Sequence, residues 1–167
     1  MSRELSKISR ILSVYHLFRN CQEVSFEELR QQLGVSEKTS LRDIRLLERA
    51  GVLEARYERK YRAFYPVSLE LRLMAEEENQ TRRKYLGKIR RLCILMARME
   101  EEAEYGDVSR VELYCGLFPE QSDRTRQRDY QELEKLGYVA EYEYDDFDET
   151  GRWHYTIPDA YSLDTFR

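Results

Sequence analysis

The chain has 167 residues, of which 41% are hydrophobic and 36% are charged, and its formal net charge is -4. This composition indicates a globular protein and excludes a disordered one, because disordered chains have a lower apolar content. No apolar run approaches the length of a membrane-spanning helix, and the N-terminal segment lacks the apolar core of a signal peptide. We therefore expect a cytoplasmic protein.

Charge is distributed unevenly along the sequence. Residues 1–66 contain 13 basic and 9 acidic residues, whereas residues 107–167 contain 7 basic and 15 acidic residues. Between them, residues 67–106 contain 8 of each sign. The N-terminal third, with a net charge of +4, is therefore the part suited to a polyanion.

Three helices are predicted at the N-terminus. Apolar residues at helical spacing predict the first helix over residues 4–19. A second helix begins at the capping box of Ser25 and ends at Gly34. Ser36 caps a third helix, which ends at Gly51.

A hairpin is predicted next, over residues 53–65, where apolar and charged residues alternate on both sides of a charged turn. Three helices followed by a β-hairpin form a winged helix-turn-helix. Residues 1–66 are therefore predicted to be a basic winged-helix domain.

The same pattern returns later in the chain. Residues 122–137 align with residues 36–51 at an offset of 86, with seven identical positions. Upstream, residues 107–109 align with residues 23–25 at an offset of 84. At this second offset, the apolar positions of the first helix fall on Leu92, Leu95, Met96 and Met99. The repeat predicts a second winged helix.

A second hairpin with an acidic turn completes this repeat, which gives a second domain at residues 82–158. Residues 67–81 are predicted to be a helical connector, and residues 159–167 a C-terminal tail. The predicted fold is thus mainly α with small β-hairpin wings (α+β). It consists of two tandem winged helix-turn-helix domains joined by a long helical connector.

An apolar stripe within residues 69–103 has two interpretations. Its members alternate spacings of four and three residues: Tyr85, Ile89, Leu92, Met96 and Met99. The stripe is either a coiled-coil dimer seam or the inner face of the first helix of the second domain. Its length, about two heptads, favours the second interpretation.

A row of cations marks one face of the third helix. Its four members lie opposite the apolar side, with no acidic residue among them: Lys38, Arg42, Arg45 and Arg49. Thr39 and Ser40 lie in the first turn, where a recognition helix approaches base edges. The first hairpin adds four cations where a wing meets the DNA backbone: Arg56, Arg59, Lys60 and Arg62. Together these groups favour double-stranded DNA as the partner.

These residues also follow a family pattern, S-x-x-T-x-x-R-D-x-x-x-L-x-x-x-G, which is filled by Ser36, Thr39, Arg42, Asp43, Leu47 and Gly51. The segment resembles the N-terminal DNA-binding domain of bacterial DeoR-type and WYL-domain transcription regulators. The resemblance covers residues 8–66, and residues 92–158 more weakly. It implies nucleoid association and DNA-facing side chains at Lys38, Thr39, Ser40 and Arg42. Full members carry a large effector domain where this chain has a second predicted winged helix, so inducer binding is not carried over.

The second copy raises two further questions. Its third helix offers a second candidate DNA contact, at Arg124, Thr125, Arg126 and Arg128. Its hairpin reverses the charge, because residues 141–149 are strongly acidic. Three interpretations are open for this acidic wing: a solvated loop, a docking surface for a basic protein partner, or an autoinhibitory cover for the first domain.

Catalytic motifs are absent from the sequence, which has no Gly-rich phosphate loop, HExxH or nucleophile elbow. The two histidines, His16 and His154, are predicted to be structural. The three cysteines fit neither a disulfide framework nor a metal site, and we expect buried thiols at Cys21, Cys93 and Cys115. We therefore expect no enzyme activity, no cofactor and no metal.

The sequence thus predicts a sequence-specific transcription regulator. The helix over residues 36–50 would enter the major groove, and the wing over residues 53–65 would contact the backbone. A homodimer is expected, since such proteins usually dock on paired half-sites. The alternative is a non-catalytic tandem winged-helix subunit of the chromosome-organisation type, which docks through its acidic second domain.

Overall fold

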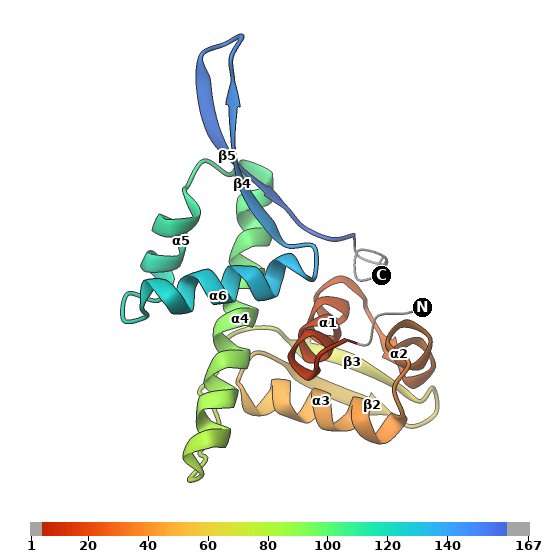
Figure 1. The fold of residues 1–167 in the computed structure, drawn as a ribbon. Coiled ribbons are helices and arrows are strands. Elements are labelled where there is room, and N and C mark those ends of the chain that lie inside the picture. The colour runs from red at the N-terminus through yellow and green to blue at the C-terminus, as the bar shows by residue number, and fades with distance from the viewer. Residues whose placement is uncertain (1–4, 160–167) are drawn as a thin grey trace.

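The computed structural model of the protein describes residues 5–159 (Figure 1). Apart from Asp159, the C-terminal tail predicted for residues 159–167 lies outside the described residues. The first half of the chain contains three helices and three short strands: α1 (Lys7–Asn20), β1 (Val24–Ser25), α2 (Phe26–Leu33), α3 (Glu37–Arg49), β2 (Glu54–Glu58) and β3 (Ala63–Ser68). The strands form an antiparallel sheet in the order β1-β3-β2.

Serine hydroxyls start the three helices. In each case the hydroxyl accepts a hydrogen bond of 3.0–3.2 Å from the amide three residues further on, at Ser6, Ser25 and Ser36. Gly34 and Gly51 end α2 and α3 with positive φ angles of 65° and 77°. The three helices and the hairpin predicted for this segment are therefore present.

The connector is not the helix that the sequence predicted. Residues 69–79 contain no helical residue and run alongside the C-terminal end of α3. There the Arg72 amide donates to the Gly51 carbonyl at 2.9 Å, and the Ala75 amide donates to the Arg49 carbonyl at 2.8 Å. Because these bonds satisfy carbonyls at the end of α3, they favour an extended chain over the local helix propensity of the connector.

The second half of the chain begins with a long helix, α4 (Gln80–Tyr105), which the Asn79 side chain caps. It continues with α5 (Arg110–Leu117), α6 (Asp123–Glu134) and the antiparallel hairpin β4 (Val139–Asp145) and β5 (Thr150–Thr156). Figure 1 shows this hairpin projecting away from α1–α3.

The apolar stripe of α4 lies inside the protein. Ile89, Leu92, Met96 and Met99 are all 0% exposed, while Tyr85 is half-buried at the edge. One continuous apolar core joins them to residues of α1, α3, α6 and the second hairpin. These side chains are therefore unavailable for a dimer seam, and the interpretation of the stripe as an internal face is confirmed.

Two buried ion pairs fasten the third helix of each half to its first helix. In the first half, the Arg10 guanidinium donates to both Asp43 carboxylate oxygens, at 2.6 and 3.1 Å. In the second half, the Arg91 guanidinium donates to both Asp129 oxygens, at 2.6 and 3.2 Å. The bidentate geometry fixes the position of α3 against α1 and of α6 against α4.

A candidate nucleic-acid interface

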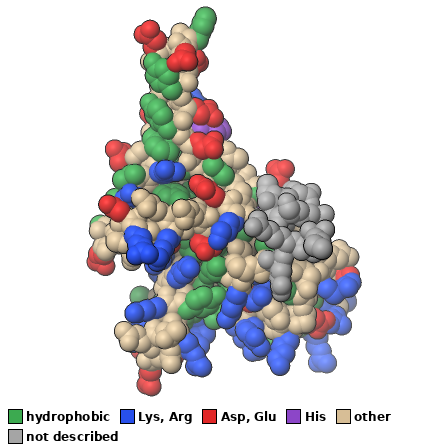
Figure 2. Space-filling model, viewed as in Figure 1, with side chains coloured by type: hydrophobic (Ala, Val, Ile, Leu, Met, Phe, Trp, Pro, Cys, Tyr) green, Lys and Arg blue, Asp and Glu red, His purple; other side chains and the backbone are tan. Residues whose placement is uncertain are grey.

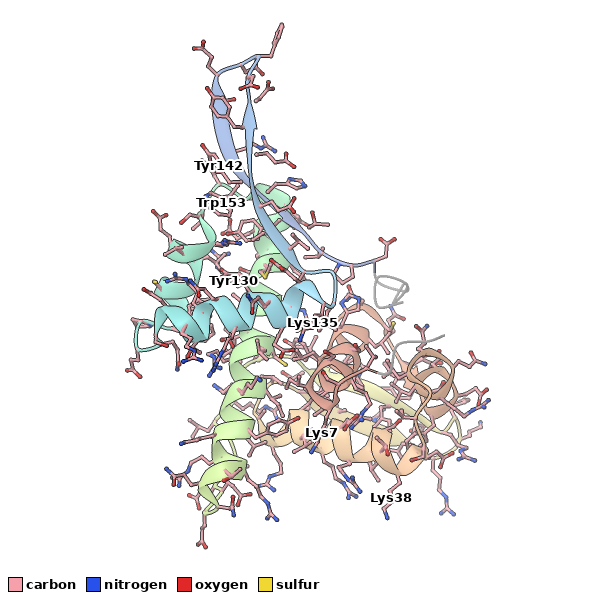
Figure 3. The ribbon with its side chains drawn as sticks, viewed as in Figure 1. Lys7, Lys38, Tyr130, Lys135, Tyr142 and Trp153 are labelled. Atoms are coloured by element: carbon pink, nitrogen blue, oxygen red, sulfur yellow. The ribbon has the colours of Figure 1, made fainter. Side chains whose placement is uncertain are left out.

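Helix α3 presents a cationic outer face. Ile44 and Leu47 are buried on its inner side, whereas Lys38, Arg42 and Arg45 are exposed. Figure 3 shows Lys38 pointing away from the core at the outer edge of α3. This face has the geometry that a helix needs to approach a duplex.

Arg49 differs from the other three cations in the row. Its guanidinium donates to the Glu77 carboxylate at 2.9 Å, and its side chain is 45% exposed. The Asn79 backbone amide lowers the pKa of the Glu77 carboxyl, and the Arg49 guanidinium lowers it further. The connector thus partly neutralises the C-terminal end of the row.

Ser40 does not face outward as the sequence predicted. The residue is 1% exposed, and its hydroxyl oxygen has no hydrogen-bond partner among the described residues. Its position one residue past Thr39 turns it toward the core, because successive helical residues are about 100° apart. The Ser40 side chain therefore cannot contact a base edge from the surface of α3, and that part of the prediction is wrong.

Thr39 remains at the start of the face, where it is half-buried. Its amide donates to the Ser36 hydroxyl at 3.2 Å, and its own hydroxyl oxygen accepts from Ser36 at 3.2 Å. The Thr39 hydroxyl proton is still available to a ligand.

The first wing carries its cations beside the start of α3. Arg56, Arg59 and Lys60 are exposed, and the Lys60 ammonium lies 5.3 Å from the centroid of the Tyr61 ring. Arg62 forms an ion pair with Glu37 in the first turn of α3. That pair holds the turn of the hairpin next to the N-terminal end of the helix.

The corresponding cations of α6 are only partly available. Arg124 and Arg128 are exposed, but Arg126 forms an ion pair with Asp123 at 2.8 Å. Thr125 is half-buried and its hydroxyl accepts from Ser122 at 3.1 Å. Two of the four predicted residues thus present unpaired charge at this surface among the described residues.

The second hairpin carries acids and uncovered aromatic rings. Tyr142 and Tyr144 are each 57% exposed, and Phe147 at the turn is 95% exposed. The Tyr142 ring lies 5.7 Å from Trp153, and the Arg110 guanidinium lies 5.7 Å from the Trp153 ring centroid. Figure 2 shows acidic side chains gathered toward the tip, remote from α3. Within the described residues 5–159, the acidic wing therefore does not cover α3.

A cationic groove between α3 and α4 was missed by the sequence analysis. It measures about 590 Å³ and is lined by Arg42 and Leu46 of α3, by Lys7, and by residues of α4 that include Lys84 and Lys88. The segment 67–106 has no net charge, and that average concealed the composition of residues 80–91, which contain six cations and no acid. A shorter charge window would have found it.

The histidines lie away from this interface. His16 is 1% exposed; its Nδ1 lies 2.7 Å from the Tyr138 hydroxyl, and its Nε2 lies 2.9 Å from the Asp159 carbonyl oxygen. The prediction of a structural histidine is confirmed for His16, which ties α1 to the second half of the chain. His154 is exposed on β5.

The cysteines differ in burial. Cys93 is buried, and desolvation raises the pKa of its thiol well above the ordinary value. Cys21 is half-buried and Cys115 is exposed on α5. The prediction of buried thiols is therefore wrong for Cys115, since its position falls on the outer side of α5. Between residues 5 and 159, no cluster of His, Cys, Asp and Glu could hold a metal ion.

Comparison with known proteins identifies the first part of the chain. Residues 10–59 match the DeoR-like helix-turn-helix domain. The matched segment includes α3 and the first strand of the wing, and the DeoR-like domain is a DNA-binding regulatory domain. No curated protein and no solved structure matches the chain. The DeoR-like domain indicates a DNA-binding transcription regulator.

No helix in the described part of the chain is long and apolar enough to cross a membrane.

Proposed function

We propose that the protein is a sequence-specific transcription regulator that inserts α3 into the major groove of DNA. The observation that carries this proposal is the exposed cationic face of α3, which lies within the DeoR-like domain. The ion pair between Arg62 and Glu37 supports it, because it holds the wing beside the entering end of the helix.

The side chains divide into two roles. Lys38, Thr39 and Arg42 lie in the first half of α3, the part of a recognition helix that approaches base edges. Lys and Arg donate to guanine, and a threonine hydroxyl donates to or accepts from either kind of base pair. Phosphate contacts fall to the cations that flank them: Arg45, Arg49, Arg56, Arg59, Lys60 and Arg62.

We infer further that the second half of the chain is a second winged helix. Its buried Arg91–Asp129 pair parallels the Arg10–Asp43 pair, and Gly137 follows α6 with a positive φ of 93°, as Gly51 follows α3. Asp43 and Asp129 keep the offset of 86 derived from the sequence.

The ion pairs also revise the sequence alignment of the first helices. Arg10 and Arg91 are 81 positions apart, three fewer than the offset of 84 used for the apolar stripe. Three residues are close to one helical turn, which is why the apolar positions fit either register. The ion pairs favour the offset of 81, because a bidentate contact tolerates no such shift.

We propose that a homodimer binds, with one α3 in each half-site. The motivation is that helix-turn-helix proteins dock on half-sites one helical turn apart, about 34–36 Å, through a two-fold axis. The acidic side chains of β4–β5 lie on the projecting hairpin, remote from α3 (Figure 2).

The experiment is selection of bound duplexes from a randomised library by the purified protein. We expect an enriched motif with two related half-sites whose centres lie about 10 base pairs apart. In the Arg42→Ala variant, at least one position of each half-site should lose its preference, at a cost of about 1–3 kcal/mol in affinity for the selected sequence. The matched control is Arg30→Ala on α2, whose guanidinium is already paired with Glu27. Recovery of no motif by the wild-type protein would contradict sequence-specific regulation.

A second candidate function is favoured by one observation, the exposed aromatic side chains on the acidic hairpin. Under this candidate the protein is a non-catalytic interaction subunit of the chromosome-organisation type, and residues 141–149 dock on a basic partner surface. The duplex selection distinguishes the two functions. An interaction subunit of this kind does not need Arg42 to read bases, so it should yield no motif that depends on Arg42.

A further inference from the structure

Helix α4 has two halves of different charge. Its first twelve residues, 80–91, contain six cations and no acid, whereas residues 92–105 contain four acids and one cation. The family match ends at residue 59, so nothing in that match assigns a role to this helix.

The cations of α4 also differ in what they contact. Arg90 donates to the Ala50 and Arg72 carbonyls, Arg91 pairs with Asp129, and Arg98 pairs with Glu101 and Glu102. These three arginines hold the fold together. Nearer the start of the helix, Arg83, Lys84 and Lys88 form no ion pair with any residue in the described range 5–159.

The unpaired cations lie beside the recognition helix. Lys84 and Lys88 line the same groove as Arg42 and Leu46, and they stand one helical turn apart on one side of α4. Figure 1 shows the start of α4 extending past α3, at the end of the molecule remote from the acidic hairpin.

The wing and the start of α4 flank α3 at opposite ends. The Arg62–Glu37 pair places the turn of the wing at the N-terminal end of α3. The Arg49–Glu77 pair places the residues just before α4 at its C-terminal end. A duplex that receives α3 in its major groove therefore has one backbone flank facing the wing and the other facing α4.

We infer that the first turns of α4, with Lys84 and Lys88 as the contacting residues, bind DNA phosphates on the flank opposite the wing. This inference rests on the proposed function. Like charges held close together without acidic partners repel one another, and a polyanion relieves that repulsion. Leu46, Tyr85 and Leu86 add apolar surface to the groove that these two lysines line. These contacts add affinity and position the protein without reading sequence.

The test uses the full chain and a labelled duplex, with affinity measured by fluorescence anisotropy at several salt concentrations. The variant is Lys84→Gln with Lys88→Gln, which keeps most of each side chain and removes two charges. The matched control is Arg110→Gln with Arg152→Gln, which removes two exposed cations from the half of the chain that carries the acidic hairpin. Circular dichroism and the urea midpoint verify that both variants are folded.

In the Lys84/Lys88 variant, we expect the slope of log K against log salt to become less steep by about 2. Each lost phosphate contact removes about 0.9 from the magnitude of this slope. The loss should be the same for selected and random duplexes, and the control should keep the wild-type slope. An unchanged slope in the folded Lys84/Lys88 variant overturns the inference and leaves the proposed function intact. Absence of DNA binding by the wild-type protein instead overturns the proposed function itself.

Discussion

The buried ion pair beneath the recognition helix provides a quantitative test of the fold. Asp43 is 0% exposed on its side chain, and its partner Arg10 is 19% exposed. Removing one member of a buried pair costs about 3–5 kcal/mol, because the other charge is left without compensation. Water reaches part of Arg10, so we expect Asp43→Ala to lower the free energy of unfolding by about 2–4 kcal/mol. The hydrogen bond to Asp43 raises the pKa of Arg10 in the wild-type protein. Without that bond Arg10 still stays charged, because an arginine side chain is not deprotonated in proteins.

The assay is urea unfolding, monitored by circular dichroism. The dependence of the unfolding free energy on urea concentration should keep its wild-type slope, which checks two-state behaviour. Replacing both partners, as Arg10→Met with Asp43→Leu, should recover most of the loss, since an apolar pair of similar volume is often neutral. The control is Glu27→Ala, which breaks the surface pair with Arg30 and should leave the midpoint nearly unchanged. A loss below about 1 kcal/mol for Asp43→Ala would refute this account of how α3 is held.

Three further predictions concern single sites. Gly51→Ala should lower the free energy of unfolding by more than about 1 kcal/mol in the same assay, because φ is 77° and the new Cβ would lie 2.5 Å from an Arg90 nitrogen. Cys115 should react with a thiol reagent in the native protein while Cys93 reacts only on unfolding, since burial protects the Cys93 thiol and raises its pKa; equal native rates would contradict this packing. Burial, and then Glu102, raises the pKa of Tyr155 to about 12, so its contribution to stability is complete below pH 10 and lost as the pH rises toward 12. Tyr155→Phe should therefore make unfolding less sensitive to alkali, as measured by urea midpoints between pH 9 and 12, and an unchanged pH dependence would count against it.

Much of the fold could be predicted from local sequence. The boundaries of α2 and α3 follow from local residues. Ser25 and Ser36 cap the N-terminal ends, and a glycine follows the C-terminal end of each helix. Alternating residues likewise predicted both hairpins. These features depend on neighbours three or four positions away, which a single sequence displays.

The errors came from contacts between distant residues. The connector has helix-forming residues, yet Arg72 and Ala75 bond to the end of α3. Ser40 has the type of side chain that reads bases, yet the packing of α3 turns it inward. Propensity and residue type contain no information about which long-range partner prevails.

The candidate site was recovered in part for the same reason. The periodicity of α3 alone predicted the exposed positions of Lys38, Arg42 and Arg45. The sequence does not predict ion pairs between distant residues. It therefore gave no sign that Arg49 pairs with Glu77, or that Arg62 pairs with Glu37.

The most direct test of the central claim is the salt dependence of duplex binding by the wild-type protein and by Arg42→Ala with Arg45→Ala, measured by fluorescence anisotropy. The account predicts affinity that falls steeply with salt, and a salt dependence whose slope is smaller in magnitude by about 1 in the double variant, which loses the phosphate contact of Arg45. Both residues are exposed on α3, so the variant should unfold at the wild-type urea concentration. Binding that is absent, or a slope that the double variant leaves unchanged, would contradict α3 as the DNA-contacting helix.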